Sequence, residues 1–254
     1  MNIIAVIQAR LGSTRLPKKV LLPLGDRSVL EWVVTRVKGS SLVSETVVAT
    51  TINKEDLEIV KVCADMGVLV YCGSQDNVLD RYYQVGNLLK ADHVVRITAD
   101  CPLIDPNIID KIITMHLEAG ADFTCNTIEV TYPDGEDVEI FKFDALKKAW
   151  ENASLKIEVE HVTPYVKNRP DIFKLVNLEH DRDLSNKRWT LDNAEDYTFM
   201  KIIIDNLYKG NPLFSMEEIL EFLEKNPHIE TINQHIIRNE GYYKQIKKEN
   251  VFIN

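Results

Sequence analysis

A cluster of cations and small polar residues lies close to the start of the chain. Residues 8–19 read QARLGSTRLPKK, and the cations among them are Arg10, Arg15, Lys18 and Lys19. Gly12 allows the backbone to approach a ligand closely, and Ser13 offers a short hydroxyl. A triphosphate is bound by such a mixture of backbone N–H donors, hydroxyls and fixed positive charge. The segment therefore predicts a phosphate-binding loop rather than a solvated basic turn, although it matches neither Walker A nor GxGxxG.

Two aspartates far apart in the sequence are candidates for a metal site beside this loop. Asp100 follows the apolar run 93–98, at the carboxyl edge of a predicted strand. A carboxylate there would repel phosphates unless a cation lay between them, and Mg²⁺ typically binds one or two carboxylates together with phosphate oxygens. Asp192 is the second candidate, with a helix N-cap as its alternative role. Asp181 and Asp183 form a DxD pattern, which is a competing candidate for metal binding.

The order of apolar runs and amphipathic stretches indicates how these residues are positioned. Strands are predicted at 3–7, 46–50, 68–71 and 93–98, and helices at 29–37, 54–66, 77–90 and from Asp105 onward. Strands that alternate with helices predict an α/β fold with a doubly wound, mostly parallel sheet. Ligands of such sheets lie at the carboxyl ends of the strands. The loops after residues 8, 50, 71 and 98 are therefore expected to converge on one crevice.

The pattern changes after about residue 125. Further strands are predicted at 138–143 and 172–178, with helices at 144–152, 158–168 and 193–208. Asp192 is expected to end a short strand before the last of these helices. A capping box at 215–218 opens another helix, and the tail from residue 242 is expected to pack weakly.

Bulk properties limit the class of protein. The chain has 254 residues, of which 45% are hydrophobic, which suits one large α/β domain with a small appended lobe. A formal net charge of −9 argues against duplex nucleic acid as a partner. No apolar run reaches about 18 residues, and the start MNIIAVIQAR is typical of a first strand, so we expect a cytoplasmic protein without a membrane span. The four cysteines form no CxxC pair and are expected to be reduced, mostly buried thiols.

The loop Arg-x-Gly-Ser-Thr-Arg-Leu-Pro-x-Lys resembles the signature of the CMP-sugar synthetases, which include the synthetases for acylneuraminate and 3-deoxy-manno-octulosonate. It resembles more closely the cytidylyltransferases of the spore coat polysaccharide F type, over the chain up to about residue 208. The resemblance implies that CTP is a substrate and Mg²⁺ the cofactor. It implies that the triphosphate is held by Arg10, Ser13, Arg15 and Lys19. It also places the metal on Asp100, before Pro102-Leu103, and on Asp192 within RWTLDNAEDY.

The same resemblance implies where the base and the acceptor bind. Residues 73–83 match the segment that runs over the cytosine, with Ser74 and Arg81 as candidate contacts. Thr98 stands where many synthetases carry a glutamine, and we count it among the nucleotide-binding residues. Residues 132–141 resemble the F-type pattern YPxGxDVExF. The candidate acceptor-binding residues are Asn126, Asp137, Glu139, His161 and Tyr165; Asp137 and Glu139 point the same way if they lie on a strand, and an exposed acidic strand face is their alternative.

These expectations combine into one hypothesis. A domain at 1–210 of Rossmann-like nucleotidyltransferase fold, with an acceptor and dimerisation lobe at about 126–180, is followed by a helical extension at 211–254. Arg15, Lys19 and Asp100 would catalyse transfer of CMP to a sugar acid or related acceptor with release of pyrophosphate, for surface polysaccharide synthesis. The alternatives are a nucleotide-sugar-dependent glycosyltransferase and a non-catalytic nucleotide-binding protein. By analogy with the family we expect a homodimer, formed through an exposed apolar surface at Ile140, Phe141 and Phe143.

Overall fold

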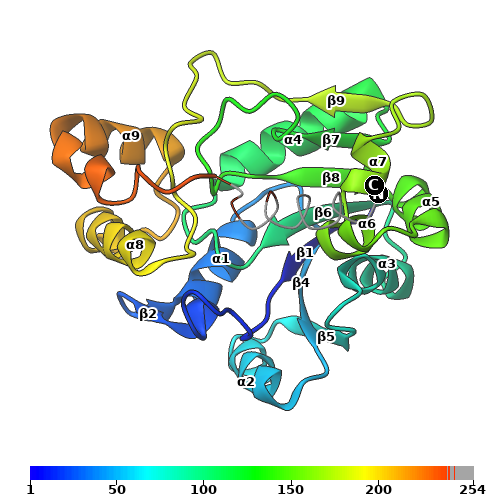
Figure 1. Ribbon diagram of the computed structural model, residues 1–254, viewed down its shortest axis with the longest axis horizontal. Coiled ribbons are helices and arrows are strands. Elements are labelled where there is room, and N and C mark those ends of the chain that lie inside the picture. The colour runs from blue at the N-terminus through cyan, green and yellow to red at the C-terminus, as the bar shows by residue number, and fades with distance from the viewer. Residues whose placement is uncertain (239, 241–242, 244–254) are drawn as a thin grey trace, which may run out of the picture.

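The computed structural model describes residues 1–238, 240 and 243 (Figure 1). Its strands are β1 (Ile3–Gln8), β2 (Pro23–Leu24), β3 (Arg27–Ser28), β4 (Glu45–Thr51), β5 (Leu69–Gly73), β6 (His93–Thr98), β7 (Phe123–Cys125), β8 (Glu139–Lys142) and β9 (Leu175–Asn177). Its α-helices are α1 (Val29–Val37), α2 (Leu57–Asp65), α3 (Val78–Leu88), α4 (Pro106–Ala119), α5 (Phe143–Asn152), α6 (Lys156–His161), α7 (Pro164–Lys167), α8 (Ala194–Leu207) and α9 (Met216–Lys225). Short 3₁₀ helices occur at Lys19–Leu21, Lys54–Asp56 and Pro227–Ile232.

One seven-stranded sheet organises the molecule, in the order β5-β4-β1-β6-β8-β7-β9. Strands β5, β4, β1 and β6 are parallel, whereas β8 runs antiparallel to both β6 and β7. The chain passes from β1 to β4 on one side and later places β6 on the other side of β1. This arrangement makes the carboxyl ends of β1 and β6 the topological switch point, where open α/β sheets bind ligands. The predicted doubly wound, mostly parallel sheet is confirmed.

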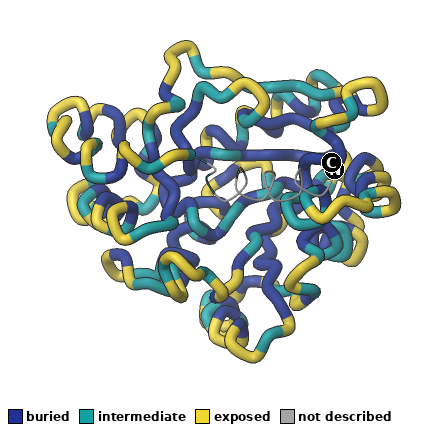
Figure 2. Tube along the Cα trace, viewed as in Figure 1, coloured by how far each residue is buried: buried dark blue, intermediate teal, exposed yellow. Residues whose placement is uncertain are grey.

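Both faces of the sheet are covered by helices, so the molecule has three layers (Figures 1 and 2). On β1, Ile3, Ala5 and Ile7 pack towards α1, α4, α8 and α9, whereas Ile4 and Val6 pack towards α3 and α5. This alternation follows from the two-residue period of a strand. Because both faces are buried, the central strands read as continuous apolar runs, as the sequence indicated.

Three helices begin where the sequence shows an N-capping residue, as predicted. Ser28 and Ser215 each form a capping box, at the starts of α1 and α9. Asp105 caps α4 with Pro106 at its first position, and its other oxygen accepts from Met216 N at 2.7 Å. Side-chain oxygens at these positions bind backbone N–H groups that a helix leaves unpaired. Among the described residues, no helix has the length and apolar character needed to cross a bilayer.

Two predicted elements in the second half are wrong. The single helix at 158–168 is divided into α6 and α7 at Val162, whose φ is 71°. Pro164 begins α7, and a proline cannot continue an α-helix from the preceding turn. The short strand expected before Asp192 does not form, and Asp137 lies before the first residue of β8.

The apolar surface proposed for dimerisation is also wrong. Ile140 and Phe141 are fully buried on opposite faces of β8, because this strand is central in the sheet. Phe143 stacks against Tyr83 with ring centroids 5.8 Å apart. The cysteine prediction holds for Cys63, Cys101 and Cys125, which are buried free thiols, whereas Cys72 is exposed. Of the tail from residue 242, all but Tyr243 lies outside the described residues.

Gly135 allows two distant segments to lie side by side. Asp134 pairs with Arg188 in an isolated parallel bridge, and Trp189 N donates to Asp134 O at 2.6 Å. Gly135 has a φ of 115°, and a Cβ atom there would lie 2.3 Å from the carbonyl oxygen of Trp189. Only glycine accommodates both constraints. The close approach fixes the path of the chain three residues before Asp192.

Substitution Gly135→Ala is expected to lower the free energy of unfolding by more than about 3 kcal/mol, because the backbone of Trp189 must move. Gly210→Ala is the matched control. Gly210 also has a positive φ, of 89°, but a Cβ atom there meets nothing within 4 Å. Its cost is expected to be the conformational term alone, about 1–2 kcal/mol. Urea unfolding of both variants measures the difference, and equal costs would show that the contact with Trp189 is unimportant.

Candidate active site

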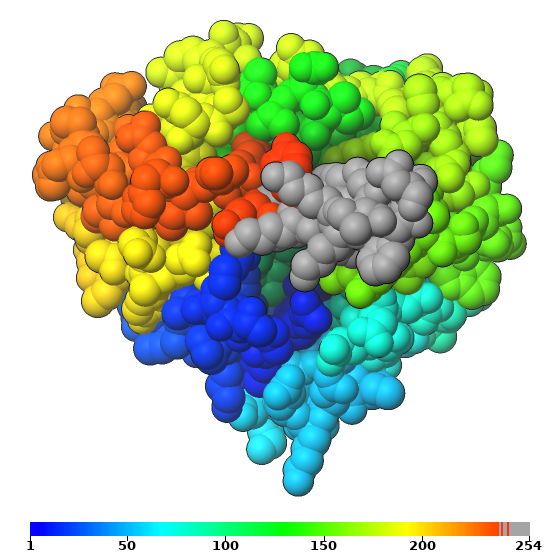
Figure 3. Space-filling model, viewed as in Figure 1, coloured from blue at the N-terminus to red at the C-terminus, as the bar shows by residue number. Residues whose placement is uncertain are grey.

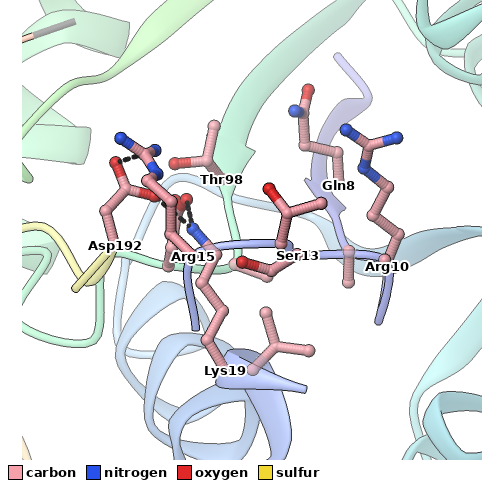
Figure 4. Close-up of a pocket in the computed structure, with 13 residues that line it drawn as sticks. Gln8, Arg10, Ser13, Arg15, Lys19, Thr98 and Asp192 are labelled. Carbon is pink, nitrogen blue, oxygen red and sulfur yellow. Dashed lines mark hydrogen bonds and ion pairs between the residues drawn. The ribbon is translucent and has the colours of Figure 1, made fainter. Parts of the chain in front are cut away.

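A cavity of about 330 Å³ opens at the switch point of the sheet (Figure 4). It is lined by Gln8, Ala9, Arg10, Gly12, Ser13, Thr14, Arg15, Lys19, Val20, Thr98, Ala99, Asp100 and Asp192. The predicted phosphate loop and both predicted metal carboxylates therefore surround one cavity. Three separate stretches of sequence supply its walls: the loop after β1, the residues after β6 and the loop before α8.

Lys19 lies between the two aspartates. Its Nζ is 2.6 Å from Asp100 Oδ2 and 2.8 Å from Asp192 Oδ1. Burial would raise the pKa of Asp100, but the charge and hydrogen bond of Lys19 lower this pKa to about 2. For Lys19, burial lowers the pKa and the two carboxylates raise it, with a net rise. Asp100 and Lys19 are therefore both ionised at neutral pH and form an ion pair.

Arg15 adds a second cation to this cluster. Its Nη2 is 2.8 Å from Asp192 Oδ2, and its Nη1 is 3.5 Å from Glu240 Oε2. Figure 4 shows Arg15 and Lys19 on the same side of the cavity as Asp192, whereas Gln8 and Arg10 lie towards the other side. The cavity thus has an end with carboxylates and cations and an end with an amide and an arginine.

Buried polar contacts hold the phosphate loop in place. Leu11 N donates to Asp56 Oδ1 at 2.7 Å, and Asp56 is also hydrogen bonded to Thr51 at the end of β4. Asp56 is 1% exposed, so this carboxylate acts as an internal anchor. A buried carboxylate that accepts backbone N–H bonds fixes loop geometry, because leaving these donors unpaired would cost free energy.

A second set of contacts positions Asp192. Leu191 N donates to the carbonyl oxygen of Asp100 at 2.8 Å, which joins the two metal candidates through the backbone. Asp192 N donates to Asp196 Oδ2 at 2.9 Å. Asp196 is fully buried and receives a two-pronged contact from Arg188, at 2.8 and 2.9 Å. Arg188 is therefore an internal partner of Asp196 and Asp134, a role that the sequence did not reveal.

A smaller cavity of about 150 Å³ adjoins the first, and Gln8, Ala9 and Arg10 line both. Its other lining residues are Gln75, Val78, Arg81, Arg96, Glu160 and His161. Arg81 is buried and donates to Ala49 O at 3.0 Å, while its Nε has no hydrogen-bond partner among the described residues. The predicted base-side segment thus reaches this cavity through Gln75 and Arg81. Ser74 lines neither cavity, and its hydroxyl accepts from Asn77 N before α3.

The five predicted acceptor residues are placed differently from one another. His161 lines the smaller cavity. Asn126 is fully buried and braces the backbone of Glu136 and Val138 through its amide. Tyr165 is buried against Phe173.

Glu139 and Asp137 both bind cations of this chain. Glu139 contacts Lys167 and Arg96, each at 2.6 Å. Burial opposes its ionisation, but these two cations lower the pKa of Glu139 to about 2, so it does not accept a proton near neutral pH. Asp137 contacts Arg238 Nη2 at 2.5 Å.

Two residues near the chain end were missed by the sequence analysis. Arg238 reaches the segment 132–137, donating to Tyr132 O and Asp137, and Glu240 pairs with Arg15. Figure 3 shows these last described residues, in red, against the N-terminal loop in dark blue. No local sequence signal marks them, because their role depends on where the chain returns in space.

The competing DxD pattern does not reach either cavity. Asp181 and Asp183 are exposed, and Asp183 Oδ1 accepts from Ser185 N in a local turn. Neither residue lines a cavity described above. In the described part of the chain, no group of three or more His, Cys, Asp or Glu side chains is placed to hold a metal ion.

Comparison with known proteins agrees with this geometry. A family model described as cytidylyltransferase matches residues 4–248. The chain is 33% identical to the spore coat polysaccharide biosynthesis protein of Bacillus subtilis, over 89% of this chain and 95% of that protein. It is 42% identical to an uncharacterised protein of Methanocaldococcus jannaschii, over 95% of this chain and 98% of that protein.

A solved structure shares both the fold and much of the sequence. The cytidylyltransferase from Leptospira borgpetersenii superposes with a TM-score of 0.86, at 34% identity, and the match covers 94% of this chain and 98% of that one. The fold, the loop after β1 and the near full-length match lead to the same assignment: the chain belongs to the cytidylyltransferase family, a class of CTP-dependent nucleotidyltransferases.

Proposed function

We propose that this protein transfers CMP from CTP to a sugar acid or a related sugar acceptor and releases pyrophosphate. The observation that carries the proposal is the cluster of Lys19, Asp100 and Asp192 at the mouth of the phosphate loop. Cations alone would bind an anion, and carboxylates alone would repel one. The combination suits a polyphosphate that is bound together with a divalent cation.

The residues present fit a magnesium ion. Asp100 and Asp192 each have an oxygen within 2.8 Å of one ammonium group, so both oxygens already face a single cationic position. Mg²⁺ commonly takes one or two carboxylates and completes its shell with phosphate oxygens and water. When bound, the metal would neutralise charge on the phosphates and orient them. We propose Asp100 and Asp192 as its protein ligands.

The cations of the loop then act on the nucleotide. Arg15 and Lys19 would exchange their carboxylate contacts for phosphate oxygens, with Lys19 near the α- and β-phosphates. The acceptor oxygen would attack the α-phosphorus, opposite the bond to the leaving pyrophosphate. Positioning and charge neutralisation are the main contributions expected for such a displacement. Arg10, Gly12 and Ser13 also line the cavity, and we propose that they complete the phosphate contacts.

The class of acceptor that we propose comes from the descriptions of related proteins. The Bacillus subtilis relative is described as a spore coat polysaccharide biosynthesis protein, so we propose a role in surface polysaccharide synthesis here as well. His161 faces the cavity that adjoins the phosphate site and is the acceptor residue we retain for direct contact. We further propose that the protein is cytoplasmic and that two copies associate.

Substitution Asp100→Asn or Asp192→Asn is expected to lower the rate of pyrophosphate release by at least about 100-fold, because each removes a charge that holds the metal. The assay contains CTP, Mg²⁺ and a panel of acidic sugars. Asp183→Asn is the matched control and is expected to keep the wild-type rate. Loss of activity in Asp183→Asn with retention in Asp100→Asn would favour the glycosyltransferase alternative instead.

Removing the ammonium group should destabilise the protein in the absence of metal. In Lys19→Met, Asp100 faces Asp192 without the ammonium group between them, although Arg15 still pairs with Asp192, so the free energy of unfolding is expected to fall by about 1–3 kcal/mol. Lys18→Met is the control from the same loop. Among the described residues Lys18 forms an ion pair with the exposed Glu58 alone, and its loss should cost less than about 1 kcal/mol.

Urea unfolding in the presence of a chelator measures both variants. Added Mg²⁺ is expected to restore part of the lost stability of Lys19→Met. A Lys19→Met protein as stable as wild type in the chelator would contradict the electrostatic role given to Lys19.

A further inference from the structure

Gln8 is the last residue of β1 and lies where the two cavities meet. It is the register partner of Thr98 on β6, so both side chains leave the sheet on the same face. Ile4 and Val6 pack on this face against the cluster that contains Tyr82 of α3. Figure 4 shows Gln8 and Thr98 standing side by side at the sheet edge. Gln8 lines both cavities, whereas Thr98 lines only the larger one.

The carboxamide of Gln8 is anchored at one end. Tyr82 is fully buried, and its hydroxyl donates to Gln8 Oε1 at 3.0 Å. The same hydroxyl lies 3.3 Å from the carbonyl oxygen of Ile97. That carbonyl is inside the parallel ladder of β1 and β6, where backbone N–H groups serve as donors. The single hydroxyl hydrogen therefore goes to Gln8, at the shorter distance.

This anchor determines what Gln8 offers to a ligand. An amide has an acceptor oxygen and a donor nitrogen, and holding the oxygen fixes which of the two faces the cavity. Gln8 Nε2 has no hydrogen-bond partner within the part of the chain that the structure describes. The amide therefore presents unused donors between the phosphate cavity and the cavity beside Arg81.

We infer that Gln8, locked by Tyr82, is the residue that selects cytosine. The inference rests on the proposed function, which places the triphosphate at the Lys19 end of the first cavity. We place the base at the adjoining cavity, which Gln75 and Arg81 of the predicted base-side segment line. Cytosine presents acceptors at O2 and N3, whereas uracil carries a hydrogen on N3. A donor held towards N3 accepts cytosine and opposes uracil. Because Tyr82 holds the amide oxygen, turning the amide over to suit uracil requires the hydroxyl to redirect its hydrogen to the carbonyl oxygen of Ile97, at the longer distance of 3.3 Å.

The position of Gln8 is also relevant to Thr98, which differs from the pattern of many CMP-sugar synthetases. Thr98 replaces the glutamine that many CMP-sugar synthetases carry two residues before the metal aspartate. The neighbouring strand supplies an amide at the same level of the sheet, through the pair Gln8 and Thr98. A carboxamide therefore remains at this edge, although it comes from β1 instead of β6.

Equilibrium binding of CTP and UTP, each with Mg²⁺, tests the inference on the full chain without needing an acceptor. Wild type is expected to bind CTP at least about tenfold more tightly than UTP, which corresponds to one well-made hydrogen bond. Gln8→Glu replaces the donor with an acceptor, so the ratio of affinities should fall by at least about tenfold. Any repulsion of the triphosphate cancels in this ratio, because both nucleotides carry it.

Tyr82→Phe removes only the anchor. The amide is then free to rotate, so the CTP to UTP ratio is expected to fall while CTP binding stays within about threefold of wild type. The matched controls are Gln234→Glu, at an exposed glutamine that lines neither the larger nor the smaller cavity, and Tyr83→Phe, the next residue on α3. Both should keep the wild-type ratio, and thermal unfolding confirms that each variant is folded.

The outcomes separate the two proposals. A wild-type protein that binds neither nucleotide would refute the proposed function and this inference with it. Equal binding of CTP and UTP by wild type would overturn the inference alone. An unchanged ratio in Gln8→Glu would also overturn it, because an amide turned the other way would offer its oxygen and tolerate a carboxylate.

Discussion

The site depends on one ammonium group that two carboxylates share. Asp100 and Asp192 are 92 positions apart in the sequence (192 − 100), and they would repel each other if they met without a cation. Lys19 allows them to meet, since its Nζ lies within 2.8 Å of both. The ammonium group holds both carboxylates in place and lowers the pKa of Asp100 to about 2. In the function that we propose, a metal ion and a polyphosphate would enter this position by exchanging with these ion pairs.

Buried polar groups, more than the apolar core, set the positions around this cluster. Arg36 of α1 is fully buried and donates to the carbonyl oxygens of Leu103 and Ile104, close behind Asp100, and to Phe214 before α9. Arg188 and Asp196 hold the loop that carries Asp192. The contacts of Arg36 join segments far apart in sequence, whereas Arg188 and Asp196 close a single loop. Burying these charged side chains costs desolvation free energy, which their hydrogen bonds offset only when every partner is in place. The loops around the site therefore depend on one another for their positions.

Two arginines that line the smaller cavity keep a donor atom unused. Glu139 binds Lys167 and Arg96 through its two oxygens. Within the described residues, the buried Nε atoms of Arg81 and Arg96 have no hydrogen-bond partner, and Gln8 lines the same cavity. Buried donors without partners are costly in a folded protein and call for an explanation, such as a ligand. The surplus of donors at this wall suits a base with acceptor atoms.

The sequence by itself determined the first half of the sheet, the helix caps, and most of the residues that line the larger cavity. Those features are local: a strand period, a capping side chain or a loop directly after a strand carries its own signal. Only the tertiary structure decided that Ile140 and Phe141 are core residues, that Asn126 braces backbone, and that Arg238 and Glu240 return to the site. Ile140 and Phe141 are buried because β8 pairs between β6 and β7. No local sequence pattern shows which strand will be central in the sheet. The orientation of Gln8 likewise depends on Tyr82, 74 residues away, because a hydrogen bond between distant segments exists only after the chain has folded.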